Sequence, residues 1–385
     1  MAAHTFVERA RALGPELRDR SDEIDELRRL PDDLVAGLVA EGFLRFWVPE
    51  QYGGAEIPVV VGMQTFIELA RHDTAVAWCC FIANTTALTA GLIAPRWAEE
   101  LFGPPGAVAG GFAAPVGRAR PVDGGLRVTG RWQWGSGTQH CTVIGGGVLL
   151  VDDEGAVAPR HDGLLAPFVL LDREDVTFHD TWHVLGVRGS GSTDYEVTDA
   201  FVPEGRWVEL TRATPTVDGP LYRFSLFALL AGGIGATAVG IAGRALEEFA
   251  ALARGKVPQG SGRTLSERPG TQADVAKAEA TVESARLFLL DAYADAWDTA
   301  VAGDVPTVEQ RRRMRLATTD ATQRCADVVS RLHRAAGGEA VYRRCPLERL
   351  FRDANVVSQH AMAAERTYEL AGRLALGLET DTSTL

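Results

Sequence analysis

A histidine near the C-terminal end offers the clearest opportunity for proton chemistry in this sequence. The stretch RLFRDANVVSQH ends at His360, and Ala361 and Met362 follow it. An imidazole ordinarily titrates at about pH 6.5, so it can both give and take a proton at neutral pH. No carboxylate stands beside it. A lone histidine among apolar residues also fits a purely structural role, so neighbouring segments must decide between the two.

A second candidate is the hydroxyl of Ser136, in the segment GRWQWGSGTQH. Apolar side chains alternate through the preceding residues at Leu126, Val128, Trp132 and Trp134. This period of two predicts a β-strand that begins after the turn at Asp123 and ends near Ser136. A hydrolase nucleophile needs Gly-x-Ser-x-Gly on a turn from strand to helix. The sequence therefore disfavours a catalytic pair of Ser136 with His140.

A glycine-rich run could suggest a dinucleotide site. GGIGATAVG, which starts at Gly232, approximates the fingerprint Gly-x-Gly-x-x-Ala. That fingerprint needs a preceding strand and a βαβ unit. The run lies instead inside an Ala- and Leu-rich helical stretch. We expect these glycines to let helices pack closely, and we expect no nicotinamide site of the Rossmann type.

Composition sets further limits. The 385 residues carry a formal net charge of −12, which argues against a nucleic-acid surface. The one dense basic run, RRRMR from Arg311 to Arg315, follows the capping pair Thr307 and Gln310. We interpret the run as a solvated helix face; the alternative is a phosphate or subunit contact.

The cysteines show no metal-binding or disulfide pattern. There are five of them: Cys79, Cys80, Cys141, Cys325 and Cys345. Their odd number, and the absence of a signal-peptide pattern, predict a reducing cytoplasm. No apolar run reaches the length of a membrane span without a polar or glycine interruption, so we expect no membrane association. No metal site is expected.

The elements that must position His360 and Ser136 fall into three blocks. Residues 1–105 read as helices, residues 106–212 as a small all-β insert, and residues 213–385 as four long helices. The long helices are expected at about 222–254, 270–302, 307–336 and 346–377, with the periodicity of an antiparallel bundle. Ligands prefer domain junctions, so we expect the site where the insert meets the bundle.

Four segments in this order resemble the acyl-CoA dehydrogenase superfamily. They are RRLPDDLVAGLVAEGFLRFWVPEQYGG (28–54), GRWQWGSGTQH (130–140), WHVLGVRGSGSTDYEVTDAFVP (182–203) and AAGGEAVYRRCPLERLFRDA (335–354). The resemblance covers about residues 15–380. Within the superfamily the chain is most similar to oxygenase components of two-component flavin-dependent monooxygenases (group D), such as those acting on phenols or on dibenzothiophene.

The resemblance implies a mainly α fold with a β-barrel insert, an acyl-CoA dehydrogenase-like fold, usually as a homotetramer. It also implies a set of residues near the flavin. Catalytic roles fall to His360 and Ser136. Cofactor-binding roles fall to Ala113, Ala114, Trp132, Trp134, Gly135, Ser136, Trp182, Gly337 and Gly338. In this arrangement Gly337 and Gly338 would approach the flavin of a neighbouring subunit.

The implied function is that of an oxygenase component. Reduced FMN or FAD would arrive from a separate reductase, possibly by diffusion alone. Oxygen would add to form a C4a-hydroperoxide, and a small aromatic, polycyclic or amine substrate would receive one oxygen atom. His360 matches the histidine of these monooxygenases, whereas Ala361 stands where the typical dehydrogenases have their catalytic glutamate.

One departure from the family concerns substrate activation. Several relatives that oxidise phenols carry a second histidine on an N-terminal helix, where this chain has Thr86 in WCCFIANTTAL. A threonine is no general base at neutral pH, so oxygen transfer to an amine, a sulfur or an enol-like carbon stays open. Two alternatives also stay open: an acyl-CoA dehydrogenase with a relocated base, and a flavin-free structural subunit.

Overall fold

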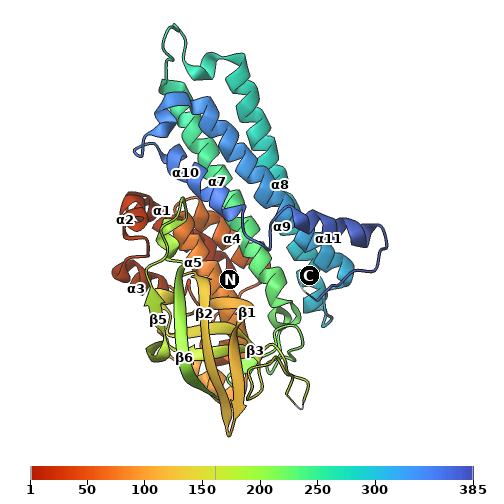
Figure 1. The fold of residues 1–385 in the computed structure, drawn as a ribbon. Helices are drawn as coiled ribbons and strands as arrows, with labels where there is room; N and C mark the ends of the chain where they lie inside the picture. The colour runs from red at the N-terminus through yellow and green to blue at the C-terminus, as the bar shows by residue number, and fades with distance from the viewer. Residues whose placement is uncertain (1, 161, 384) are drawn as a thin grey trace.

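The chain folds around an open β-sheet that is flanked by helices from both ends of the sequence. The computed structural model describes residues 2–160, 162–383 and 385. In Figure 1 the sheet lies at the bottom, the N-terminal helices pack beside it, and the long helices of the C-terminal part rise above both. This order of helices, sheet and bundle confirms the predicted fold class.

The N-terminal helices enclose one very apolar member. The helices are α1 (Ala2–Asp19), α2 (Ser21–Leu27), α3 (Asp32–Ala40), α4 (Val59–Ala70), α5 (Thr74–Ala87) and α6 (Pro95–Phe102). Every residue of α5 is buried. The carboxylate of Asp73 accepts the main-chain N–H of Val76 at 3.0 Å and so caps this helix. Helix α5 lies between the sheet and the bundle, because it contacts both β1 and α7.

The seven strands form one mixed sheet in the order β5-β6-β2-β1-β3-β4-β7. They are β1 (Ala109–Val122), β2 (Gly125–Gly135), β3 (Val143–Leu150), β4 (Phe168–Asp172), β5 (Thr177–His179), β6 (Thr193–Pro203) and β7 (Trp207–Val208). The two edge strands, β5 and β7, do not pair with each other. The predicted barrel is therefore wrong in detail, because the sheet stays open at two very short strands.

The hairpin of β1 and β2 has the predicted turn, but its period-two pattern breaks before the strand ends. Leu126, Val128 and Trp132 are buried, as alternation predicts. The pairing of β2 with β6 then shifts between Trp132 and Gly135. Trp134 takes a left-handed backbone (φ 58°), and 57% of its surface is exposed. The shift therefore turns out an indole that simple alternation would bury.

The bundle has three long helices and one interrupted one. They are α7 (Leu226–Gly255), α8 (Pro269–Val301), α9 (Val308–Ala336), and the pair α10 (Pro346–Val357) and α11 (Arg366–Ala375). Thr307 and Gln310 form the predicted capping box at the start of α9. The single helix expected at 346–377 is wrong, because the chain leaves the helical path between Val357 and Arg366.

The basic run on α9 is only partly a solvated face. Arg312 forms an ion pair with Glu309 at the surface side of the helix, as predicted. Arg315 is buried, with 4% of its surface exposed. The interpretation of the whole run as solvated is therefore wrong for its last arginine, because the other elements of the bundle cover this part of the helix; the neighbouring Met314 is buried as well.

The glycines of α7 let neighbouring helices approach, as predicted. A Cβ atom at Gly233 would lie 2.6 Å from the ring of Phe81, and one at Gly232 would lie 2.5 Å from Met63. Two stretches, Thr74–Gly91 and Leu226–Gly255, are long and apolar enough to cross a membrane by length and composition alone. Both are mostly buried inside the protein, which explains their apolar character.

Replacing Gly233 with alanine tests this close packing. We expect G233A to lower the free energy of unfolding by about 1–3 kcal/mol, because the added methyl overpacks against Phe81. Gly243 on the same helix supplies the matched control, since a Cβ there meets only the tip of Arg71 at 3.4 Å. G243A should be neutral or raise stability by about 1 kcal/mol in urea unfolding. Equal losses in the two variants would contradict the packing role of Gly233.

Candidate active site

Trp78 brings the two predicted catalytic residues into one site. Its indole Nε1–H donates to Ser136 Oγ at 2.9 Å. Its ring centroid lies 5.8 Å from that of His360. Helix α5, strand β2 and the segment after α10 therefore meet at this tryptophan. Trp78 was not among the predicted site residues, although it lies in the WCC stretch about two helical turns before Thr86.

A row of three serine hydroxyls gives Ser136 a defined polarity. Ser190 Oγ donates to the carbonyl oxygen of Val187 at 2.7 Å, and a carbonyl can only accept. Ser190 must therefore accept from Ser192 at 2.7 Å, and Ser192 must accept from Ser136 at 2.7 Å. The single hydrogen of Ser136 is thus used within the row. Its oxygen, which also receives the Trp78 N–H, is an acceptor toward any ligand.

Val187 connects this row to the bundle. Its main-chain N–H donates to Asp353 Oδ1 on α10 at 2.6 Å. Its carbonyl also accepts the indole N–H of Trp182 at 3.3 Å. Val187 has a left-handed backbone (φ 52°), which is rare and strained for a β-branched residue. The aspartate of the FRDA run thus holds the loop that carries the serines.

His360 follows α10 in a turn and is not on a long helix as predicted. Its main-chain N–H donates to Val357 O at 3.2 Å. Its Nδ1 accepts the main-chain N–H of Met362 at 3.2 Å. A nitrogen that accepts an N–H carries no hydrogen of its own, so the neutral ring bears its hydrogen on Nε2. The main chain therefore fixes which nitrogen of His360 can donate.

The imidazole of His360 is neutral at physiological pH. Burial, and then the positive charge of Arg315, lower its pKa from 6.5 to about 4. The expectation of a ring that titrates near neutrality is therefore wrong. Burial likewise lowers the pKa of His140 to about 4. Ser136 bonds to Trp78 and Ser192 rather than to His140, in line with the rejected hydrolase pair.

An exposed aromatic surface lies beside the serine row. The Trp134 indole packs edge-on against Phe112, with centroids 5.7 Å apart. Ala113 and Ala114 follow Phe112 where the pairing of β1 with β3 shifts, so they bulge from the strand. Gly135 has no room for a side chain, because a Cβ there would lie 2.7 Å from Tyr195. The exposed face of the Trp134 indole, next to irregular backbone, suits the stacking of a planar ring.

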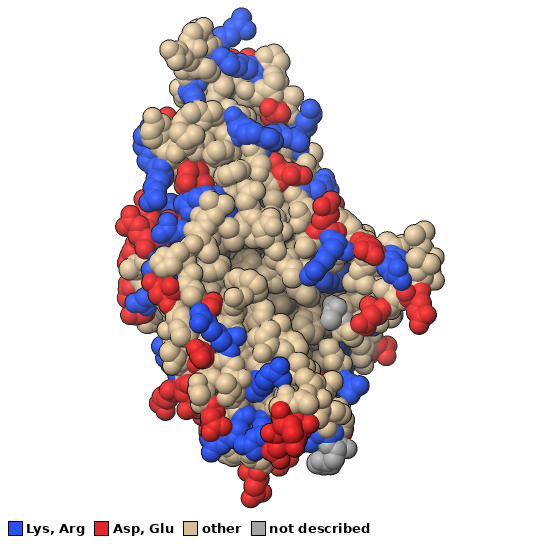
Figure 2. All heavy atoms as spheres, in the orientation of Figure 1, with Lys and Arg blue, Asp and Glu red and all other residues tan. Residues whose placement is uncertain are grey.

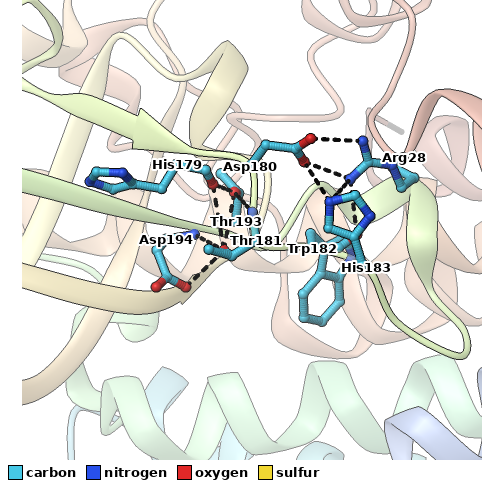
Figure 3. A network of polar contacts seen from close by, with 8 residues as sticks. All are labelled: Arg28, His179, Asp180, Thr181, Trp182, His183, Thr193 and Asp194. Carbon is cyan, nitrogen blue, oxygen red and sulfur yellow. Dashed lines mark hydrogen bonds and ion pairs between the residues drawn. The ribbon is translucent and has the colours of Figure 1, made fainter.

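A polar network holds Trp182 beside this surface (Figure 3). Arg28 pairs with Asp180 at 2.6 Å, and its guanidinium also contacts the ring of His183 at 3.3 Å. On the other side Thr181 donates to Asp194 at 3.0 Å. Trp182 lies between these anchors, and its ring points toward the bundle helices in Figure 3. The network therefore fixes the direction of one predicted flavin contact.

Two other groups of predicted residues lie elsewhere. Trp132 is wholly buried, stacks on Tyr195 at 5.2 Å and donates to Gly147 O. Its assignment to the flavin is wrong, because no surface of its ring is left for a ligand. Gly337 and Gly338 are exposed where α9 ends, and Gly337 has φ 63°. Their predicted contact with a second subunit's flavin stays a prediction.

Carboxylates near the site are committed to other partners. The buried acids of the described residues are Asp25, Asp73, Asp194 and Asp353. Asp353 and Asp73 accept main-chain N–H groups, while Asp25 and Asp194 pair with arginines. Thr86 lies on the face of α5 that carries Trp78, and its hydroxyl has no hydrogen-bond partner within the described part of the chain. The polar groups left for chemistry are thus an imidazole and hydroxyls.

The surrounding surface suits the planar ring system of a ligand. Figure 2 shows a hollow in an area free of charged side chains, midway between the bundle and the sheet. Exposed Trp134, half-buried Trp182 and the acceptor oxygen of Ser136 are the groups that could hold an isoalloxazine ring. These residues fit a flavin, which would supply the redox chemistry when bound.

Comparison with known proteins agrees with this site. Residues 3–95 match the family described as "Acyl-CoA dehydrogenase, N-terminal domain", and residues 232–365 match "Acyl-CoA dehydrogenase, C-terminal domain". The chain is 31% identical over 370 residues to an indole-3-acetate monooxygenase of Pseudomonas putida, covering 95% of this chain and 92% of that one.

Two further relatives indicate which branch of this superfamily the chain belongs to. The oxygenase subunit HsaA of a flavin-dependent monooxygenase from Rhodococcus jostii is 31% identical, with 98% of this chain and 100% of the relative covered. The structure of XiaF from Streptomyces, in complex with FADH2 and glycerol, superposes with a TM-score of 0.91 at 25% identity, covering 98% and 96% of the two chains. This chain belongs to the acyl-CoA dehydrogenase superfamily, in its flavin-dependent monooxygenase branch. The expected enzyme class is thereby confirmed.

The lowered pKa of the His360 imidazole leads to a prediction about acid stability. Its pKa is lower in the folded protein than in the unfolded chain, so the unfolded chain binds more protons between about pH 6.5 and pH 4. Stability should therefore fall as the pH drops through this window. We expect H360Q to flatten part of that fall in urea unfolding measured at pH 7.5, 6 and 5.

The surface-exposed His183 supplies the control, since H183Q removes an imidazole whose side chain is 64% exposed. Its stability profile should follow that of the parent protein. His140 accounts for the acid sensitivity that H360Q leaves behind. If H360Q and the parent protein lose the same stability between pH 7.5 and 5, the burial and neutrality of the His360 ring are refuted.

Proposed function

We propose that this chain is the oxygenase component of a two-component system that places one oxygen atom from O2 on a small aromatic or heteroaromatic substrate. Reduced FMN or FAD comes from a separate reductase. The observation that carries the proposal is the contact series Ser136–Trp78–His360, which places a hydroxyl and a neutral imidazole against one indole, with no free carboxylate beside them among the described residues. The 31% identical relatives named as monooxygenases support it.

In this proposal the chain's residues bind, orient and protect. Trp134 and Trp182 supply flat surfaces on which a ring rests, and the buried helices α5 and α7 keep water out of the cavity. His360 presents Nε2–H as a donor to a developing negative charge. It gives this hydrogen bond and keeps the proton, because a neutral imidazole that lost its only N–H hydrogen would become an anion. A substrate that is already electron-rich needs no stronger base.

The polarity of Ser136 favours the reduced state of the flavin. The N5 nitrogen carries a hydrogen in reduced flavin and a bare lone pair in oxidised flavin. Ser136 offers only an acceptor oxygen, because its hydrogen is given to Ser192. An oxygenase that receives reduced flavin from a partner fits this polarity.

A dehydrogenase with a relocated base is not supported. Helix α7 has no Asp or Glu from Leu226 to Ala245, which is the part of the helix packed against α5 and α9. The buried acids described above are committed to main-chain groups or arginines. A purified protein that is yellow and bleached by an acyl-CoA would nevertheless restore that alternative.

We also expect a homotetramer and a cytoplasmic location. Five unpaired, buried cysteines fit a reducing compartment. Exposed apolar residues on α8 and in the short turn after α9, such as Leu287 and Val341, fit a contact with further copies of the chain.

Replacing His360 tests the catalytic assignment. We expect H360N to lower the fraction of O2 that is coupled to product, and to raise hydrogen peroxide release, with the rate of oxygen transfer falling by about 10²-fold or more. Reduced-flavin binding should change little, because Trp134, Trp182 and Ser136 remain. The measurement is rapid mixing of the reduced-flavin complex with oxygen, followed by product and peroxide assay. Parental coupling in H360N would remove His360 from the mechanism.

Replacing Ser192 tests the polarity of Ser136. S192A removes the acceptor of the Ser136 hydrogen, so Ser136 becomes able to donate to a bare nitrogen. We expect the preference for reduced over oxidised flavin to shrink by about three- to tenfold, the value of one hydrogen bond. Anaerobic titrations with both redox forms measure it. S21A, which removes a buried serine hydroxyl bonded to Leu17 O, is the control and should keep the parental preference.

A further inference from the structure

Arg315 is a buried arginine that forms no ion pair with any described residue. The described part of the chain buries three arginines: Arg45, Arg206 and Arg315. Arg45 donates to the carbonyl oxygens of Pro104, Tyr52 and Phe102, and Arg206 pairs with Asp172. Arg315 has 4% of its surface exposed, and its Nε and Nη1 atoms have no hydrogen-bond acceptor. Its positive charge is therefore unmatched inside the protein.

Three acids on and beside the half of α9 that carries Arg315 are paired with other arginines. Glu309 binds Arg312, Asp291 binds Arg313 at 2.6 Å, and Asp320 binds Arg324 at 3.0 Å. These arginines lie toward the outside of the bundle, whereas Arg315 faces inward. Each of these three arginines thus has a carboxylate partner among the described residues, whereas Arg315 has none.

Nearby hydroxyls do not replace the missing anion. Burial raises the pKa of Tyr293 to about 12, so this residue stays neutral, and its hydroxyl donates to Ala228 O at 2.5 Å. Thr319 and Thr322 donate to the carbonyl oxygens of Arg315 and Thr318 in the preceding turn. None of these groups accepts a hydrogen bond from the Arg315 guanidinium.

Arg315 lies on the helix that packs against the turn carrying His360: Gln323, about two turns further along α9, donates to Ser358 O at 3.1 Å and to Ala363 O at 2.9 Å. Its charge is felt by the imidazole of His360, whose pKa it helps to lower. Helix α9 contacts α7, α8, α10 and α11, and α7 and α5 separate it from the sheet. The surface that would carry the flavin, formed by Trp134 and Ser136, belongs to β2. Helix α9, which carries Arg315, and the sheet, which carries the flavin surface, are therefore separated by α5 and α7.

A buried charge without a partner lowers the stability of the folded protein. Proteins therefore retain one mainly where a bound ligand supplies the opposite charge. The planar guanidinium offers parallel N–H donors that match the two oxygens of a carboxylate. We propose that Arg315 binds the carboxylate of the substrate, which makes the substrate class an aromatic carboxylic acid. This assignment rests on the proposed function, because it takes the cavity beside His360 as the substrate site.

A matched pair of probes tests the assignment. Indole-3-acetate and indole-3-acetamide differ at the carboxylate alone, and both are titrated calorimetrically under anaerobic conditions, with and without reduced FMN. We expect the parent protein to bind the acid at least about tenfold more tightly than the amide. R315Q should weaken acid binding by about 10–100-fold and leave amide binding nearly unchanged, and R315K should recover part of the loss.

Two controls separate the possible outcomes. R312Q alters an arginine of the same helix that is already paired with Glu309, and it should keep the acid-over-amide preference. R315M removes the charge and keeps the length, so it should hold or raise the melting temperature, whereas a structural arginine would make it fall. A fall in melting temperature would overturn the proposal.

Three binding results would also overturn it. The parent protein could bind the acid and the amide equally tightly, or R315Q could lose the same affinity for both probes. Alternatively, R315Q could lose affinity for reduced flavin and keep its preference for the acid over the amide. The last result would assign the charge to the anionic reduced flavin instead. Failure of oxygen transfer with a retained acid preference would refute the proposed function and leave the carboxylate site standing.

Discussion

The hydrogen bond from the Val187 amide to the buried carboxylate of Asp353 holds the two halves of the site together. It joins the loop before β6 to helix α10, and Arg352 adds a second link by donating to Leu185 O at 2.8 Å. From Val187 the row of serine hydroxyls leads to Ser136 and Trp78. From Asp353 helix α10 continues to Val357, and the following turn places His360. The position of the imidazole relative to the hydroxyls therefore depends on one contact between elements that are 166 residues apart.

The charges in the site determine when His360 can accept a proton. The cavity has a neutral imidazole, hydroxyls and an unpaired guanidinium, but no free carboxylate among the described residues. A carboxylate bound at Arg315 would cancel one of the two causes that lower the pKa of His360. The ring would then be a better proton acceptor only when the substrate is in place. Such coupling would limit proton transfer in the empty site.

Much of the fold and part of the site follow from sequence patterns, because helix periodicity and turn residues act locally. The three long helices α7, α8 and α9, and the hairpin after Asp123, are of this kind. The residues that were missed depend on long-range packing. Trp78 reaches Ser136 across 58 positions, and Arg315 looks like a surface residue in a basic run until the bundle encloses it. Alternation favoured Trp132 and Trp134 equally, and only a shift in strand pairing distinguishes them.

The left-handed backbone at Trp134 has a consequence for attempts to make this protein more robust. A bulky residue at φ 58° costs conformational energy of about 1 kcal/mol or more, and its indole gains little from burial because most of it faces solvent. Glycine would relieve the strain at once. A directed-evolution campaign that selects only for survival of heating would therefore tend to erase this indole early, so heat-resistant variants should be genotyped at this codon before they are used as catalysts.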